Sequence, residues 1–139
     1  MCVLIKLVLR GEQGVSSGSV VEVSAETWEK EVLESDIPVV VDFWHHDCDW
    51  CRALNPIYDE LSNEYVGRLK FAKLNVLESH ENQHIAIQYG IMGTPTLKFF
   101  CTGRTVGELV GYRPKNLLKE EVDRILSQIK ECLEKSTPL

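Results

Sequence analysis

Short apolar runs bounded by turn-forming residues predict a series of β-strands along the chain. The longest run, residues 38–44, is apolar throughout except for one aspartate and the entry proline. Such a run is typical of a strand that is covered on both faces. The last two runs flank Thr102-Gly103-Arg104, which indicates a β-hairpin. The other predicted strands are 20–23, 69–76, 96–101 and 105–110.

Between these runs, apolar residues recur at steps of three and four, which is the period of an α-helix. The clearest stretch begins at Cys51 and ends near residue 66. A shorter helix is expected before the central strand, with Ser24 as its N-cap, and another over residues 82–89. Pro114 opens a final helix. Its apolar stripe comprises Leu118, Val122, Ile125 and Ile129.

Strands interleaved with helices predict an α/β fold in which helices cover a central mixed β-sheet. The chain of 139 residues fits one domain, which we assign to residues 20–139. Residues 1–19 form an N-terminal extension, because residues 11–19 are rich in glycine and serine and resemble a linker. The extension is either a loose tail or an extra edge strand formed by residues 3–9.

The charge and the apolar segments exclude several classes of partner. A net charge of −6 argues against nucleic acid and anionic membranes. Lys6 divides the apolar N-terminus into pieces too short for a signal peptide, and no segment is long enough to cross a membrane. We therefore expect a cytoplasmic monomer.

The cysteines point to redox chemistry at one place. Cys48-Asp49-Trp50-Cys51 lies where the central strand meets the next helix, and a Cys-x-x-Cys at such a corner is suited to thiol–disulfide exchange. Five cysteines are too few for a disulfide scaffold. Of the three others, Cys101 is expected to be exposed at the hairpin and Cys132 to be packed, and Cys2 has no assigned role.

The two cysteines of this pair differ in their expected exposure. Cys51 precedes Leu54 by three residues, so it shares the phase of the apolar stripe and points inward. Cys48 lies at the helix entrance, where unpaired backbone N–H groups and the helix dipole stabilise a thiolate. We therefore expect Cys48 to attack a substrate disulfide and Cys51 to resolve the mixed disulfide.

Asp42 is unusual in a strand that is otherwise buried, because an uncompensated buried carboxylate is costly. Either the strand face is exposed to solvent at this position, or the carboxyl occupies a protected polar pocket. In the second case Asp42 lies beneath the dithiol and relays the proton of Cys51, and Lys73 on the neighbouring strand balances its charge. Burial would then raise the pKa of Asp42.

Metal binding is the main alternative to redox chemistry. A structural zinc site needs four ligands, and the chain has no second Cys-x-x-Cys. His45 and His46 are adjacent, so they face opposite ways at a strand end, and we interpret them as solvated rim residues. A metal or iron–sulfur carrier using Cys48, Cys51 and His46 remains the alternative binding function.

Several short motifs occur in a fixed order along the chain. They are Val41-Asp42-Phe43-Trp44, the dithiol, Pro56, Lys73-Leu74-Asn75-Val76, Tyr89-Gly90-Ile91, Gly93-Thr94-Pro95-Thr96 and Val110-Gly111. Together they resemble the thioredoxin family over about residues 20–134. The match is specific because it combines many short pieces, each of which is weak alone.

The resemblance implies a thioredoxin fold, with Cys48 as nucleophile, Cys51 as resolving thiol and Asp42 as buried proton acceptor. It also implies a cis peptide before Pro95, beside the sulfurs, where backbone groups of Thr94 meet an extended substrate. Trp44 and Trp50 are the aromatic residues expected at the substrate surface, and Lys73 and Asp49 are expected to support the site.

The dithiol also departs from the family pattern. Thioredoxins usually have Gly-Pro between the cysteines and Trp before the first, whereas this chain has Asp49-Trp50 and Asp47. An exposed carboxylate about 6 Å from the sulfur opposes formation of the thiolate by less than about 1 kcal/mol. The helix N-terminus favours the thiolate by about 0.3–1 kcal/mol, so the direction of the net pKa shift of Cys48 stays open.

The resulting functional prediction is a protein-disulfide reductase that cycles between a dithiol and a disulfide without a bound cofactor. Its expected partners are proteins that contain disulfides and an electron donor of the thioredoxin-reductase type. The alternative enzyme is a disulfide oxidase or isomerase with a more oxidising cysteine pair. The redox potential stays open, because a difference of about 30 mV corresponds to only about 1.4 kcal/mol.

Overall fold

The computed structural model describes residues 19–136, with side-chain burial described up to residue 129. Cys2 and the candidate strand at residues 3–9 lie outside the described residues. The choice between a tail and an edge strand is therefore not tested. The side chain of Cys132 also lies outside them, so its expected packing stays a prediction.

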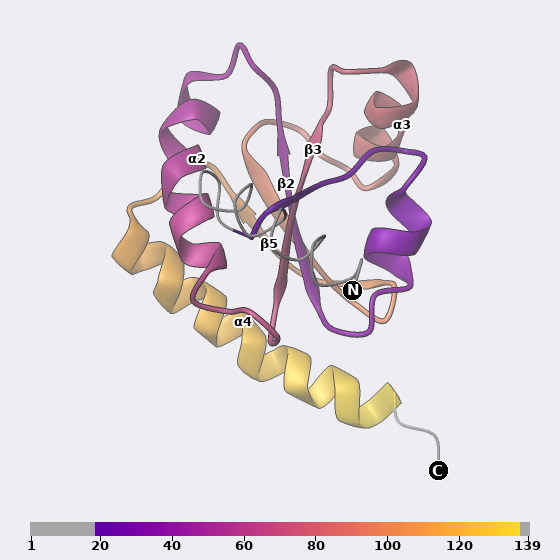
Figure 1. Ribbon diagram of the computed structural model, residues 1–139, viewed down its shortest axis with the longest axis vertical. Helices are drawn as coiled ribbons and strands as arrows, with labels where there is room; N and C mark the ends of the chain where they lie inside the picture. The colour runs from indigo at the N-terminus through magenta and orange to yellow at the C-terminus, as the bar shows by residue number, and fades with distance from the viewer. Residues whose placement is uncertain (1–18, 137–139) are drawn as a thin grey trace, which may run out of the picture.

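The described chain forms a five-stranded sheet with helices (Figure 1). The strands have the spatial order β1-β3-β2-β4-β5. β2 pairs in parallel with β3 and antiparallel with β4, which confirms the predicted mixed sheet. In chain order the elements are β1 (Val21–Glu22), the π-helix η1 (Glu29–Leu33), β2 (Val39–Trp44), α2 (Asp49–Ser62), β3 (Lys70–Asn75), α3 (His80–Gln88), β4 (Thr96–Cys101), β5 (Arg104–Val110) and α4 (Lys115–Ser136).

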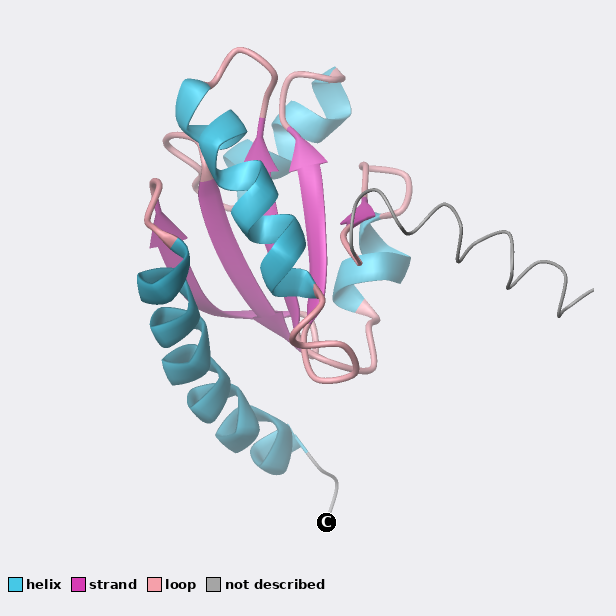
Figure 2. Ribbon diagram, turned by 60° about the vertical axis from the view of Figure 1, so that its left-hand side comes forward, coloured by secondary structure: helices cyan, strands magenta, loops and turns pink. Residues whose placement is uncertain are grey.

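Helices cover both faces of the sheet, as predicted for this fold class. In Figure 1, α2 and α4 lie to one side of the strands, and η1 and α3 lie to the other; Figure 2 shows the same layers from a second direction. Two apolar clusters fill the spaces between these layers. The first joins the sheet to α2 and α4 and includes Leu54, Tyr58, Leu118 and Val122. The second surrounds Trp28.

The central strand β2 contributes alternate residues to the two clusters. Val40 belongs to the cluster under α2 and α4, whereas Val39, Val41 and Phe43 belong to the opposite cluster. Because side chains alternate along a strand, Asp42 shares the face of Val40 and lies on the side of the sheet that α2 covers. The strand therefore delivers a carboxyl toward the helix that begins at the dithiol.

The first helix begins later than the sequence predicted, and the N-cap assignment of Ser24 is wrong. The residue that precedes η1 is Trp28, which makes no side-chain capping hydrogen bond. Ser24 instead belongs to a turn, in which its backbone N–H donates to Thr27 Oγ1 over 3.0 Å and its carbonyl accepts from the Thr27 N–H. The Trp28 ring packs against Phe43 and Phe100 directly before η1 begins.

The expectation that Cys101 is exposed at the hairpin is also wrong, since its exposed fraction is 0%. The turn between β4 and β5 is tighter than predicted and consists of Thr102 and Gly103, which have φ angles of 50° and 82°. Positive φ at both turn positions is typical of a two-residue type I′ hairpin. Cys101 is the last residue of β4, and it lies on the face of Leu97 and Phe99 that packs under α4.

Candidate functional site

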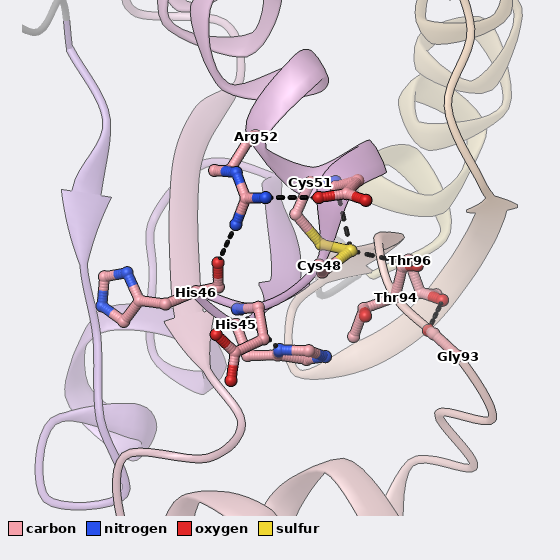
Figure 3. Close-up of a disulfide and its surroundings, with 10 residues drawn as sticks. His45, His46, Cys48, Cys51, Arg52, Gly93, Thr94 and Thr96 are labelled. Atoms are coloured by element: carbon pink, nitrogen blue, oxygen red, sulfur yellow. Dashed lines mark hydrogen bonds and ion pairs between the residues drawn. A yellow bond between two sulfur atoms is a disulfide. The ribbon is translucent and has the colours of Figure 1, made fainter.

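The site is built around the turn that carries the chain from β2 into α2. Cys48 is the N-cap of α2 and has extended backbone angles, φ −98° and ψ 110°. Its sulfur accepts a hydrogen bond from the Cys51 backbone N–H at 3.1 Å (Figure 3). The Cys48 sulfur thus pairs a backbone donor that the first turn of a helix otherwise leaves unpaired.

Cys48 and Cys51 form a disulfide whose Cα atoms are 5.2 Å apart (Figure 3). That separation is within the usual range for a disulfide. Cys51 has an exposed fraction of 0%, whereas Cys48 is partly exposed. The structure thus has one accessible sulfur and one recessed sulfur, as the helical phase predicted.

The segment before β4 lies against the accessible sulfur. The Thr94–Pro95 peptide bond is cis, as the resemblance implied. The Cys48 sulfur lies 3.5 Å from the carbonyl oxygen of Thr94 (Figure 3). Thr96 Oγ1 donates to the Gly93 carbonyl at 2.6 Å and closes the turn from the other side. These contacts place the backbone of Thr94 beside the reacting atom.

A small pocket opens beside this segment, with a volume of about 220 Å³. Trp50, with 61% of its surface exposed, forms one wall, and its ring centre lies 5.3 Å from that of Tyr112. Thr94, Pro95 and Gly111 complete the lining. Sequence reasoning missed Tyr112. Its position directly after the Val110-Gly111 motif was the available signal, but only the folded chain brings it to Trp50.

Trp44 lies in a different environment from Trp50. Only 7% of its surface is exposed, its ring centre is 5.0 Å from Lys73 Nζ, and the His46 ring meets it edge-on at 4.6 Å. It lines a separate pocket of about 420 Å³ together with His45 and His46. Its expected contact with substrate stays a prediction, and such a contact would involve only the small exposed part of the ring.

Asp42 is fully enclosed, with an exposed fraction of 0%. The alternative in which the strand is exposed to solvent at this position is therefore wrong. Neither carboxylate oxygen has a hydrogen-bond partner among the described residues. Burial raises the pKa of Asp42 from 3.8 to about 7, an effect that the positive charge of Lys73 partly offsets. Lys73 is the register partner of Asp42 on β3, and its ammonium lies 3.7 Å from a carboxylate oxygen of Glu22. Its expected role in balancing the charge of Asp42 stays a prediction.

The acidic residues beside the dithiol are exposed, and one of them is paired. The Asp49 side chain is 86% exposed and forms an ion pair with the guanidinium of Arg52 (Figure 3). The same guanidinium donates to the backbone carbonyl of His46. Asp47 donates its backbone N–H to His45 Nδ1 at 3.2 Å. Sequence reasoning did not single out Arg52, although its place one residue after Cys51 puts it in the first turn of α2.

Comparison with known proteins decides the family. The family model for thioredoxin matches residues 19–124. The chain belongs to the thioredoxin family. Thioredoxin 1 from Nostoc sp. is 41% identical over 105 residues, which cover 76% of this chain and 95% of the relative. Thioredoxin from Synechocystis sp. matches with the same identity and coverage. Thioredoxin M-type, chloroplastic, from Spinacia oleracea is 39% identical over 76% of this chain and 57% of its own length.

Membership of the thioredoxin family and the Cys48–Cys51 disulfide identify the protein as a thiol–disulfide oxidoreductase. The altered dipeptide Asp49-Trp50 therefore lies within a thioredoxin-type redox centre. Among the side chains that the structure describes, no group of three or more His, Cys, Asp or Glu is arranged to hold a metal ion. None of the helices in the described part of the chain is long and apolar enough to cross a membrane.

Proposed function

We propose that this protein works as a protein-disulfide reductase, in which Cys48 and Cys51 pass two electrons to a substrate disulfide without a bound cofactor. The observation that carries the proposal is the difference between the two sulfurs, one partly exposed beside Thr94 and one fully buried. A single accessible sulfur favours a fixed order of attack and release.

In the first step, the Cys48 thiolate attacks one sulfur of the substrate disulfide. A bond forms between the Cys48 sulfur and that sulfur, the substrate S–S bond breaks, and the second substrate sulfur leaves as a thiolate. The Cys51 backbone N–H, 3.1 Å from the Cys48 sulfur, and the N-terminus of α2 stabilise the attacking anion.

In the second step, Cys51 loses its proton and attacks the Cys48 sulfur, which restores the internal disulfide and releases the substrate as a second thiolate. Asp42 accepts the Cys51 proton, directly or through water, because it lies on the face of β2 that α2 covers. Its pKa of about 7 suits a base that must be ionised near neutral pH and protonated in turn. Two electrons and, after protonation, two protons reach the substrate.

The surface around the Cys48 sulfur supports a proposal for how a substrate binds. We propose that a substrate enters as an extended segment along Thr94 and the Trp50–Tyr112 pocket, with its disulfide at Cys48. Electrons would come from a thioredoxin-reductase-type enzyme, with the protein acting as a monomer. A reducing compartment, with the cytoplasm as our choice, fits a chain of five cysteines with one Cys-x-x-Cys pair.

A redox equilibrium with glutathione tests the direction of the reaction. The reductase proposal predicts a midpoint potential below that of the glutathione couple, together with reduction of insulin when a dithiol regenerates the enzyme. An equilibrium in which glutathione readily reduces the pair would instead support the oxidase or isomerase. Stoichiometric metal in freshly purified protein, lost in Cys48→Ser, would support a metal carrier.

Trp50→Ala tests the substrate pocket. We expect KM for a peptide disulfide to rise about two- to tenfold with kcat unchanged, because a well-placed aromatic contact contributes about 0.5–1.5 kcal/mol. Steady-state kinetics with saturating electron donor measures both constants. Val66→Ala is the matched control, since Val66 is 69% exposed but follows the opposite end of α2 from the dithiol. An equal change in KM for both variants would contradict the assignment of the pocket.

A further inference from the structure

Arg52 makes two contacts that concern the redox centre. Its side chain turns back over the first turn of α2, where one guanidinium nitrogen pairs with Asp49 and the other donates to the backbone carbonyl of His46 (Figure 3). The second contact fixes the cation against the turn that carries Cys48. The Asp49 side chain is 86% exposed and that of Arg52 is 56% exposed, so both charges lie at the surface of the site.

The ionisable groups around Cys48 come from three elements. The turn contributes His45, His46 and Asp47, the first turn of α2 contributes Asp49 and Arg52, and β2 contributes the enclosed Asp42. The segment on the other side of the sulfur contributes the carbonyl of Thr94 and the uncharged walls of the Trp50–Tyr112 pocket. Among these groups Arg52 carries a permanent positive charge, whereas Asp47 and Asp49 both oppose a thiolate.

We propose that Arg52 is a positioning residue for thiol–disulfide exchange. Its positive charge compensates the negative charge of Asp49 and so favours ionisation of the Cys48 thiol at neutral pH. The idea rests on the proposed role of Cys48 as nucleophile. It accounts for an acidic residue between the cysteines, because the helix places Arg52 three positions after Asp49, on the same side of the helix. Arg52 is not among the residues that line the Trp50–Tyr112 pocket.

The test measures the thiolate directly, so it does not depend on substrate turnover. Reduced full-length protein is alkylated with iodoacetamide across a range of pH, and modification of the Cys48 peptide is followed by mass spectrometry. In Arg52→Gln we expect alkylation at the wild-type half-maximal pH to slow about 1.3- to threefold, with an unchanged plateau at high pH. An unchanged pH profile would overturn the proposal.

Three companion variants separate charge compensation from a structural effect. Asp49→Asn should shift the profile the opposite way, and Asp49→Asn combined with Arg52→Gln should return it close to wild type. Arg52→Lys should keep the wild-type profile, because the positive charge remains. Arg68→Gln, which removes an exposed arginine beyond the far end of α2, should have no effect.

The remaining outcomes are also decisive. If the double variant keeps the slow profile of Arg52→Gln, Arg52 does not act by compensating Asp49, and the proposal fails. It fails equally if the plateau rate at high pH falls with the rate at the half-maximal pH, because that pattern indicates a displaced or blocked sulfur. If the alkylation result holds but insulin is not reduced, the compensation stands and the proposed reductase function is the part in error.

Discussion

Cys48→Ser is expected to reduce the rate of protein-disulfide reduction at least about 10³-fold, because a serine hydroxyl can neither ionise near neutral pH nor form a disulfide. Cys48 supplies the accessible sulfur, and Cys51 has an exposed fraction of 0%, so it has no route to an external disulfide. Reduction of insulin in the presence of dithiothreitol, corrected for the rate without enzyme, measures the loss.

Cys51→Ser is the matched variant for this experiment. It also lacks the internal disulfide and bears the same Cys-to-Ser exchange, but it keeps the accessible sulfur. We expect it to accumulate a stable mixed disulfide with substrate, which non-reducing electrophoresis detects and which Cys48→Ser does not form. Trapping by Cys48→Ser but not by Cys51→Ser would reverse the two roles and contradict the proposed mechanism.

Asp42→Asn is expected to stabilise the protein at alkaline pH. Burial raises the pKa of Asp42 from 3.8 to about 7, so the native state retains a proton that the unfolded state releases between these values. Stability therefore falls as pH rises from about 4 to 7, and the ionised carboxyl costs at most about 4 kcal/mol above pH 7. Asparagine cannot ionise, so guanidinium unfolding should show a gain at pH 8 that is nearly absent at pH 4.

Asp59→Asn is the control for this effect, since Asp59 also faces the charge of Lys73 but is only partly buried. Its gain at pH 8 should be clearly smaller than that of Asp42→Asn. Asp42→Asn should also slow the release of substrate from the mixed disulfide by about tenfold or more, as expected on loss of a general base. A variant that gains no stability at pH 8 would show that Asp42 is not enclosed as described.

The features that the sequence predicted well depend on local periodicity. The phase of Cys51 relative to Leu54 predicted a recessed sulfur, and both side chains are fully buried. The apolar run around Asp42 predicted a central strand, and the structure encloses the carboxyl. In both cases a repeat of about four or two residues determines which way a side chain points, so neighbours in the sequence carry the information.

The features that sequence reasoning missed depend on contacts between distant parts of the chain or on the details of a turn. Tyr112 reaches Trp50 only because the segment after β5 returns to the start of α2. Cys101 was predicted to be exposed because it ends a strand beside a turn, but alternation along β4 places it on the buried face with Leu97 and Phe99. The N-cap assignment of Ser24 was wrong because Ser24 forms a turn with Thr27, and the helix begins only after Trp28.

The complete burial of Cys51 has a consequence for how the protein behaves among other thiols. Under the proposed mechanism Cys51 attacks the mixed disulfide from within the same molecule, so release of a bound protein by this route is unimolecular. The rate of this route does not depend on the concentration of glutathione or another small thiol. The lifetime of the mixed disulfide on this route is therefore a property of the protein and its bound substrate.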